Sequence, residues 1–181
     1  MEMIIDCVCA GMTRSGDVYP IGLSNEILQL AVDNTTTMIK DMIQVEKPKK
    51  VFLGGTCNGS AWRDNLIKQL KIDYFNPVGD DWNEECYQEE LKQRKICDYC
   101  LYVITPKMTG MYSIAEVIDD SNKRPKKTIF CLLREDEVKD SYNIRFEPSQ
   151  YRSLDRVGRM VKDNGAQYFT SLEEVSKFLN A

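Results

Sequence analysis

Short apolar runs of strand length alternate with helical patterns along most of this 181-residue chain. The clearest runs are residues 51–53, 99–104 and 128–133. The last of them shows no alternation of apolar and polar residues, as expected of a strand covered on both faces. Strands that alternate with helices usually pair in parallel through right-handed crossovers. We therefore predict a three-layer α/β fold with a Rossmann-like parallel sheet of about five strands.

The remaining pattern completes this organisation. It predicts further strands at 72–76 and 166–169, and helices at 60–70, 83–95, 113–121, 154–164 and 171–180. Ahead of this core, residues 4–10 indicate an extra strand and residues 23–44 a long helix. The polar stretch 134–151 is predicted to be either a mobile loop over the site or a long solvated connection. We expect one α/β domain over 1–181, with 1–47 as an N-terminal extension and 48–181 as the core.

The composition narrows the chemistry. Histidine is absent, which excludes Ser-His-Asp and Cys-His nucleophile systems and most zinc sites. We predict no metal and no cofactor, so proton chemistry falls to carboxylates, lysine, tyrosine or cysteine. The seven cysteines are predicted to be reduced thiols, and Cys57 is the most noteworthy because it lies in a glycine-rich loop.

The same composition bears on location and partners. Glu2 and Asp6 interrupt any secretory leader pattern, so a cytoplasmic location is expected. No apolar run approaches the roughly 20 residues that a membrane span requires. The net charge is −4, and no basic stripe marks polymeric nucleic acid as a partner.

A glutamate follows the predicted strand 99–104. The segment 109–116, Thr-Gly-Met-Tyr-Ser-Ile-Ala-Glu, is expected to open a helix with Glu116 on its first turn. Ser113 and Glu116 match a capping box, which needs no further function. Glu116 also follows the carboxyl end of a strand, where open α/β sheets bind ligands. The two interpretations are compatible, because a helix N-terminus favours the charged carboxylate that a nucleophile must have.

Other polar residues follow neighbouring strands. The loop 54–60, Gly-Gly-Thr-Cys-Asn-Gly-Ser, allows a ligand to approach the backbone and leads to a helix N-terminus, although a tight turn is the alternative. Asp80 and Asp81, beside Trp82, would contact a sugar hydroxyl or a base, or would form a solvated turn. Glu90, on the helix before strand 99–104, is either a site residue or a solvent-face charge.

Carboxylates at one sheet edge, without histidine or metal, suit a reaction with an oxocarbenium-like transition state. One carboxylate attacks the anomeric carbon, and another group protonates the departing base or activates water. The candidate catalytic residues are Glu116, Asp80, Asp81 and Glu90. The candidate substrate-binding residues are Gly54, Gly55, Thr56, Asn58, Trp82, Tyr112 and Ser113.

These segments resemble the nucleoside 2-deoxyribosyltransferase superfamily, and most closely its nucleoside 2-deoxyribosyltransferase-like branch from bacteria and phages. The resemblance covers about residues 50–133 and depends on 51–56, 74–82, 90–98 and 108–116. It implies a flavodoxin-like sheet, and a glutamate that becomes glycosylated at C1′ of deoxyribose. It also implies a pocket completed by neighbouring subunits, and hence a homo-oligomer.

In the positions of this chain that match the family, the resemblance implies that the nucleophile is Glu116. The acid that meets the nucleobase is Asp80 or Asp81, and the acid that orients the nucleophile is Glu90. The resemblance therefore implies cleavage or transfer at the N-glycosidic bond of a nucleoside or nucleotide.

Several alternatives stay open. Members that transfer deoxyribose commonly carry an aromatic hydroxyl just after the first strand, where this chain has Thr56 and Cys57. The sequence does not choose between hydrolysis and transfer. A nucleotide-binding protein without turnover and an NAD glycohydrolase are the other two function classes.

Overall fold

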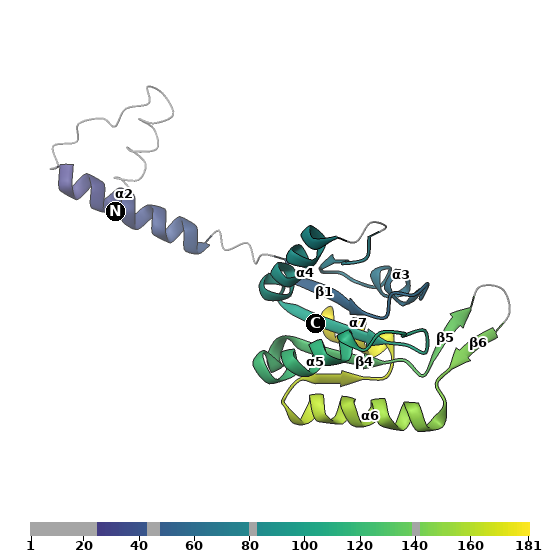
Figure 1. Cartoon of the computed structure of the whole chain (residues 1–181). Helices are drawn as coiled ribbons and strands as arrows, with labels where there is room; N and C mark the ends of the chain where they lie inside the picture. Colours follow the sequence, from purple (N-terminus) through teal and green to yellow (C-terminus); the bar gives the residue numbers. More distant parts are fainter. Residues whose placement is uncertain (1–24, 43–47, 80–82, 139–141) are drawn as a thin grey trace. The chain divides into compact units, whose positions relative to one another are not determined.

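The computed structural model describes residues 25–42, 48–79, 83–138 and 142–181 (Figure 1). The chain forms two compact units, residues 1–47 and residues 48–181. In the first unit, helix α2 (Asn25–Met42) occupies most of the predicted helix 23–44. The strand predicted at 4–10 lies outside the described residues.

The second unit is built around a parallel sheet. Its strands are β1 (Lys50–Gly55), β2 (Asp73–Phe75), β3 (Tyr99–Ile104), β4 (Thr128–Leu132) and β7 (Gln167–Phe169). They lie in the order β2-β1-β3-β4-β7, and each neighbouring pair is parallel. This confirms the predicted three-layer α/β fold, and the observed order is that of flavodoxin-like sheets. The order reverses between β1 and β3, the point at which such sheets bind ligands.

Helices cover both faces of the sheet and give the three layers visible in Figure 1. Helices α3 (Trp62–Ile67) and α7 (Leu172–Leu179) pack on one face, where Leu66 and Val175 join the core. Helices α5 (Tyr112–Lys123) and α6 (Pro148–Asp163) pack on the other through Val117 and Val161. Helix α4 (Glu84–Ile96) contacts α5 through buried ion pairs. The site elements are therefore anchored on a core buried on both sides.

Side chains cap the first turns of two helices. The Asn83 side chain accepts a hydrogen bond from the Cys86 amide at the start of α4. The Ser171 hydroxyl accepts one from the Glu174 amide at the start of α7. These contacts satisfy amide groups that have no partner within their helices.

The capping box predicted from Ser113 and Glu116 is wrong. Helix α5 begins at Tyr112, its N-cap is Met111, and no side chain caps it. Ser113 is consequently inside the helix, and Glu116 lies on the second turn rather than the first. The Glu116 carboxylate accepts a hydrogen bond from Arg94 instead.

The loop or solvated connection predicted over 134–151 is also wrong. Strands β5 (Glu135–Val138) and β6 (Tyr142–Arg145) form an antiparallel hairpin, and α6 already begins at Pro148. The acidic run at the start of this stretch has poor strand propensity. Its pairing is supported across the hairpin by the Arg145–Glu135 ion pair at 2.8 Å.

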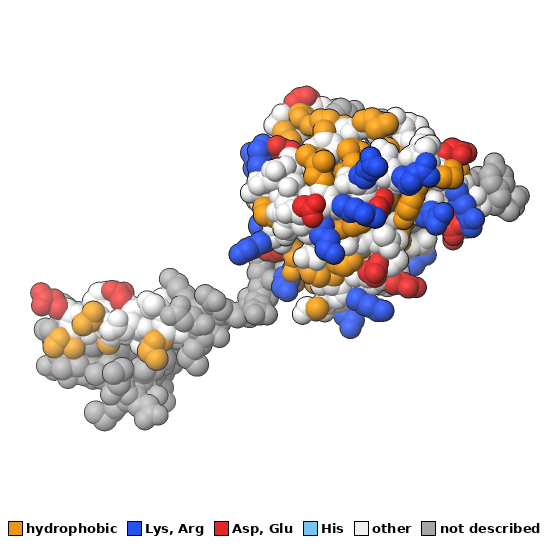
Figure 2. All heavy atoms as spheres, turned by 90° about the horizontal axis from the view of Figure 1, so that it is seen from below, with side chains coloured by type: hydrophobic (Ala, Val, Ile, Leu, Met, Phe, Trp, Pro, Cys, Tyr) orange, Lys and Arg blue, Asp and Glu red, His pale blue; other side chains and the backbone are white. Residues whose placement is uncertain are grey.

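The surface of the second unit has no single dominant character on the face shown in Figure 2, where basic, acidic and apolar side chains are interspersed. None of the helices described here is long and apolar enough to cross a membrane.

Candidate active site

A pocket of about 300 Å³ lies at the carboxyl ends of β1 and β3. Its wall comes from the end of β1, the segment after β2, and helices α3, α4 and α5. Six of the predicted site residues line it: Gly54, Gly55, Glu90, Tyr112, Ser113 and Glu116. The topological switch point thus brings together residues that lie up to 62 positions apart (116 − 54) in the sequence.

A second pocket of about 250 Å³ shares part of this wall. Thr56 and Asn58, the remaining predicted binding residues of the described chain, line it together with Thr109. Asp80, Asp81 and Trp82 lie outside the described residues, so their predicted roles stay predictions. Gly79, which precedes them in the sequence, belongs to the wall of the first pocket.

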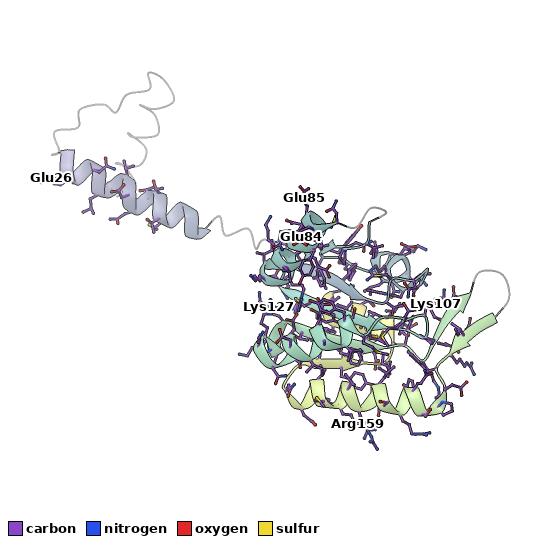
Figure 3. The ribbon with its side chains drawn as sticks, in the orientation of Figure 1. Glu26, Glu84, Glu85, Lys107, Lys127 and Arg159 are labelled. Atoms are coloured by element: carbon purple, nitrogen blue, oxygen red, sulfur yellow. The ribbon has the colours of Figure 1, made fainter. Side chains whose placement is uncertain are left out.

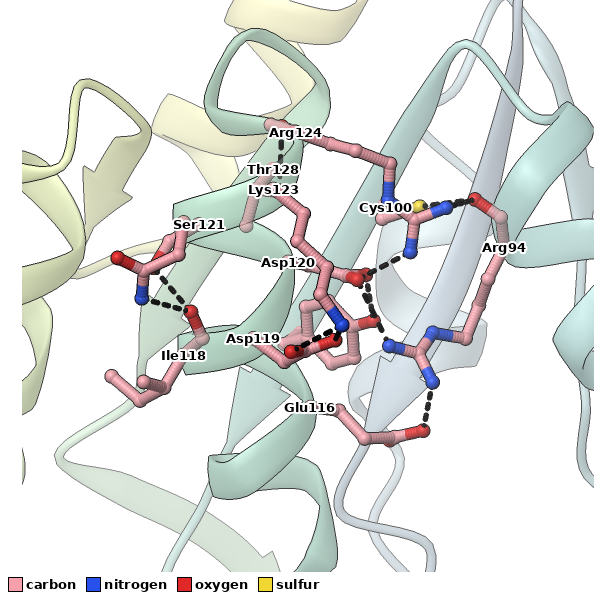
Figure 4. A network of polar contacts seen from close by, with 12 residues as sticks. Arg94, Cys100, Glu116, Ile118, Asp119, Asp120, Ser121, Lys123, Arg124 and Thr128 are labelled. Carbon is pink, nitrogen blue, oxygen red and sulfur yellow. Dashed lines mark hydrogen bonds and ion pairs between the residues drawn. The ribbon is translucent and has the colours of Figure 1, made fainter.

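Glu116 is a buried carboxylate, with 6% of its surface exposed. Its Oε1 accepts a hydrogen bond from Nη1 of Arg94 at 2.6 Å (Figure 4). Burial raises the pKa of Glu116 to about 7, and the charges of Glu90 and Asp120 act in the same direction against Arg94. The positive charge of Arg94 offsets only part of this rise in pKa. Arg94, and not a helix cap, supplies the positive charge at Glu116.

Asp120 anchors the ionic network behind Glu116. Its carboxylate is fully buried and accepts from Nη2 of Arg94 at 3.0 Å and from the Arg124 guanidinium. The Tyr102 hydroxyl donates to its other oxygen. Two arginines and a tyrosine therefore compensate one buried aspartate, as burial of a charge requires.

Sequence reasoning missed Arg94. The one available signal was its position four residues after Glu90 on the same predicted helix, which places both on one helical face. Arg94 Nε is buried and has no hydrogen-bond partner within the described part of the chain. Glu90 itself is half-buried in the pocket wall, and burial raises its pKa against the opposing charges of Arg94 and Arg63.

A buried arginine shapes the loop after β1. Arg63 donates through Nε to the Leu53 carbonyl at 3.1 Å and through Nη1 to the Thr56 carbonyl at 2.7 Å. The Thr56 hydroxyl accepts from the Thr105 amide at 3.0 Å. The sequence signal for Arg63 was a charged residue on the short helix that follows a glycine loop. These contacts hold the ends of β1 and β3 together beside the pocket.

Gly55 is required where it stands. Its φ is +113°, and a Cβ there would lie 2.1 Å from the Val103 carbonyl oxygen. Both the backbone conformation and the space restrict this position to glycine. Close approach of β1 and β3 leaves the backbone itself as part of the pocket wall.

Lys107, labelled in Figure 3, joins three segments beside the second pocket. Its ammonium donates to the Gly59 carbonyl at 2.8 Å and to the Glu137 carbonyl of the β5–β6 hairpin. Asn58 donates to the Thr109 hydroxyl at 2.6 Å. The hairpin is in this way tied to both loops that form the second pocket.

The described residues hold no group of three or more histidine, cysteine, aspartate or glutamate side chains that could bind a metal ion. Cys57, Cys100 and Cys131 are free thiols. Cys57 is exposed and lines both pockets, whereas Cys100 and Cys131 are buried.

A flavodoxin-like sheet with a carboxylate-lined pocket at its switch point is the arrangement in which α/β proteins commonly bind small molecules at the sheet edge. Residues 48–135 match the family described as nucleoside 2-deoxyribosyltransferase like. The match confirms, for this segment, the resemblance predicted from the sequence. The match contains β1 to β4, and with them Glu90, Arg94 and Glu116. No curated protein matches the chain.

Proposed function

We propose that the protein cleaves or transfers the N-glycosidic bond of a nucleoside or nucleotide, with Glu116 as nucleophile and a covalent glycosyl-enzyme intermediate. The proposal depends mainly on one observation: Glu116 is a buried carboxylate in the wall of a pocket at the β1–β3 switch point. The family match over residues 48–135 supports a nucleoside deoxyribosyltransferase-like activity in general. Glu90 in the same wall supplies a second carboxyl group, as retaining glycoside chemistry uses.

In the first chemical step, an oxygen of Glu116 forms a bond to C1′ while the bond from C1′ to the base nitrogen breaks. The electron pair leaves with the base, which takes a proton from Asp80 or Asp81. In the second step, water or another base attacks C1′ and gives its proton to the Asp80 or Asp81 carboxylate left by the first step, while the Glu116 carboxylate departs. Hydrolysis and transfer differ only in this acceptor.

The two adjoining pockets, of about 300 and 250 Å³, supply room for a sugar with a base or a phosphate. The backbone at Gly54 and Gly55 lets the substrate approach closely. Ser113 and the free amide groups at the start of α5 would face a 5′-phosphate, because a helix N-terminus favours anions. Thr56, Asn58 and Tyr112 would frame the sugar, and Trp82 the base.

The ionisation of Glu116 sets the working pH of this mechanism. A nucleophilic carboxylate must be deprotonated, and the pKa of Glu116 is about 7. Base release is therefore expected to increase as the pH rises through about 7 and to level off above it.

The proposal extends to the assembly and location of the protein. Met111 and Tyr112 are exposed at the start of α5, and Tyr112 lines both pockets. We propose that a neighbouring copy covers this apolar edge in a cytoplasmic homo-oligomer. Sedimentation of the full chain would give a single monomer species if this extension is wrong.

The test incubates the full chain with a panel of deoxynucleosides, ribonucleosides, their 5′-monophosphates and NAD. Free base is followed by chromatography, with Glu116→Ala and Glu116→Gln beside the wild type. Base release that is lost in both variants supports the proposal, and release that survives Glu116→Ala overturns it. Tight binding without release would identify a binding protein, and release of nicotinamide alone would identify an NAD glycohydrolase.

A further inference from the structure

Arg94 makes a two-point contact that reaches from the pocket wall into the protein interior. It lies in the last turn of α4, and 8% of its side chain is exposed. Nη1 donates to Oε1 of Glu116 at 2.6 Å, and Nη2 donates to Oδ1 of Asp120 at 3.0 Å. One planar guanidinium thereby links a carboxylate that lines the pocket with one that does not (Figure 4).

The guanidinium is held from the side away from the pocket. Asp120 is fully buried and is bound by Arg124 and Tyr102 as well as by Arg94. Arg124 also donates to the Arg94 backbone carbonyl at 2.7 Å. These contacts restrict the Arg94 side chain before any ligand arrives, and preorganisation of this kind is what a reacting group needs.

The contact treats the two oxygens of Glu116 differently. Oε1 accepts from Arg94, whereas Oε2 has no hydrogen-bond partner within the described residues. An oxygen without a hydrogen bond keeps its lone pairs for attack, and the bonded oxygen fixes the plane of the carboxylate.

We propose that Arg94 is a positioning residue for Glu116: it holds Oε1 so that Oε2 bonds to C1′, and it stabilises the carboxylate when the sugar departs. This inference depends on the proposed function. When the glycosyl-enzyme forms, the bond from Oε2 to C1′ replaces the bond from C1′ to the base, and the electron pair leaves with the base. When it breaks, an acceptor oxygen or nitrogen bonds to C1′, and the electron pair of the bond from Oε2 to C1′ returns to Glu116.

Arg94 favours the ionisation of Glu116 but lowers the nucleophilicity of the resulting carboxylate. Its positive charge favours the ionised nucleophile at neutral pH, and it makes the carboxylate a better leaving group in the second step. Loss of Arg94 is therefore expected to slow breakdown of the glycosyl-enzyme more than its formation, once Glu116 is ionised.

The charged groups around Glu116 make the effect of Arg94 on its pKa testable. Helix α4 presents Arg94 and Glu90 to it, and α5 contributes Asp120 and Tyr112. Tyr102 of β3 lies behind Asp120. Among the groups that act on Glu116 in the described structure, Arg94 is the one whose charge lowers its pKa. An opposite charge at this range is worth about 1–3 pH units.

The experiment compares wild type with Arg94→Gln and Arg94→Lys. In the wild type, the rate of base release rises with pH as Glu116 ionises, and this rise is the acidic limb of the pH profile. Glutamine removes the charge of Arg94, so the acidic limb should move to a pH about 1–3 units higher. The glycosyl-enzyme, followed by intact mass after rapid mixing, should persist about 10-fold longer at a pH where Glu116 is ionised. Lysine keeps the charge but not the two-point fork. It should leave the limb near its wild-type pH while base release falls by about 10-fold.

Arg124→Gln is the matched control. Arg124 binds Asp120 and the Arg94 carbonyl but does not touch Glu116. Because Arg124 helps to restrict Arg94 but leaves its charge in place, the variant should lower the unfolding temperature and should change the acidic limb and the lifetime of the glycosyl-enzyme less than Arg94→Gln does. An equal change in both arginine variants would identify a merely structural network and overturn the inference.

Titration of Glu116 by carbon-13 NMR, assigned with Glu116→Gln, separates failure of this inference from failure of the proposed function. If wild type releases no base, the function fails, yet the Glu116 titration should still move upward in Arg94→Gln. An unchanged titration in Arg94→Gln overturns the role of Arg94, whatever the activity. If Arg94→Gln does not fold, wild-type base release by Arg94→Lys overturns the inference.

Discussion

Replacing Glu116 by glutamine should change how the stability of the protein depends on pH. Glutamine keeps an acceptor oxygen for Nη1 of Arg94 but cannot ionise. In the wild type, burial holds the pKa of Glu116 at about 7 in the folded state, whereas an exposed glutamate titrates near 4.3. The folded carboxyl group therefore keeps its proton over a range of pH in which the unfolded one has lost it.

The sign and size of the effect follow from this difference. A folded pKa that is raised gives stability that is present below about pH 4.3 and is lost as the pH rises through about 7. Each pH unit of the interval is worth about 1.4 kcal/mol. Relative to Glu116→Gln, the wild type should lose about 3 kcal/mol of unfolding free energy between about pH 4 and pH 8. Only 6% of Glu116 is exposed, so solvent screening reduces this little.

The assay is urea unfolding of both proteins at several pH values between about 4 and 8. Glu85→Gln is the control, because Glu85 is an exposed acid in the first turn of α4. A constant difference between wild type and Glu116→Gln across the interval would refute the reasoning, and so would a wild type that gains stability as the pH rises.

Three further substitutions or modifications test the walls of the pockets. Gly55→Ala should lower the unfolding free energy measured in urea by about 3 kcal/mol or more, because φ is +113° and a Cβ would meet Val103. An unfolding free energy equal to that of the wild type would contradict this. Lys107→Met should raise KM by about 10-fold with a smaller effect on kcat, because it removes two charged hydrogen bonds that hold the loops beside the second pocket. An unchanged KM would contradict this. Alkylation of exposed Cys57 with iodoacetamide should block base release, and Cys57→Ser should resist the reagent; full activity of the alkylated wild type contradicts this.

The sheet was predictable from local sequence because its strands are buried on both faces. The strand predicted at 99–104 is β3 to the residue, since every position from Cys100 to Ile104 is buried and apolar. The β5–β6 hairpin was not predictable in the same way. Its acidic first strand has weak intrinsic strand propensity. Contacts between residues distant in sequence help to hold it, such as that between Lys107 and the Glu137 carbonyl.

The candidate site was predictable in position but not in its electrostatics. Parallel strands bring their carboxyl ends to one edge, so Gly54 and Glu116 were expected near each other, and both line the same pocket. The Arg94–Glu116 ion pair spans 22 residues and depends on how α4 and α5 pack. Local spacing favoured a Ser113–Glu116 cap instead, because no local pattern reveals that α5 starts at Tyr112.

The most direct test of the account is to trap and locate the glycosyl-enzyme. The wild type is mixed with a substrate from which it releases base, denatured within the lifetime of the intermediate, digested and analysed by mass spectrometry. The account predicts a mass increase equal to the sugar residue on the peptide that contains Glu116, and no such increase in Glu116→Gln. A sugar attached to any other residue, or base release by Glu116→Ala at the wild-type rate, would contradict it.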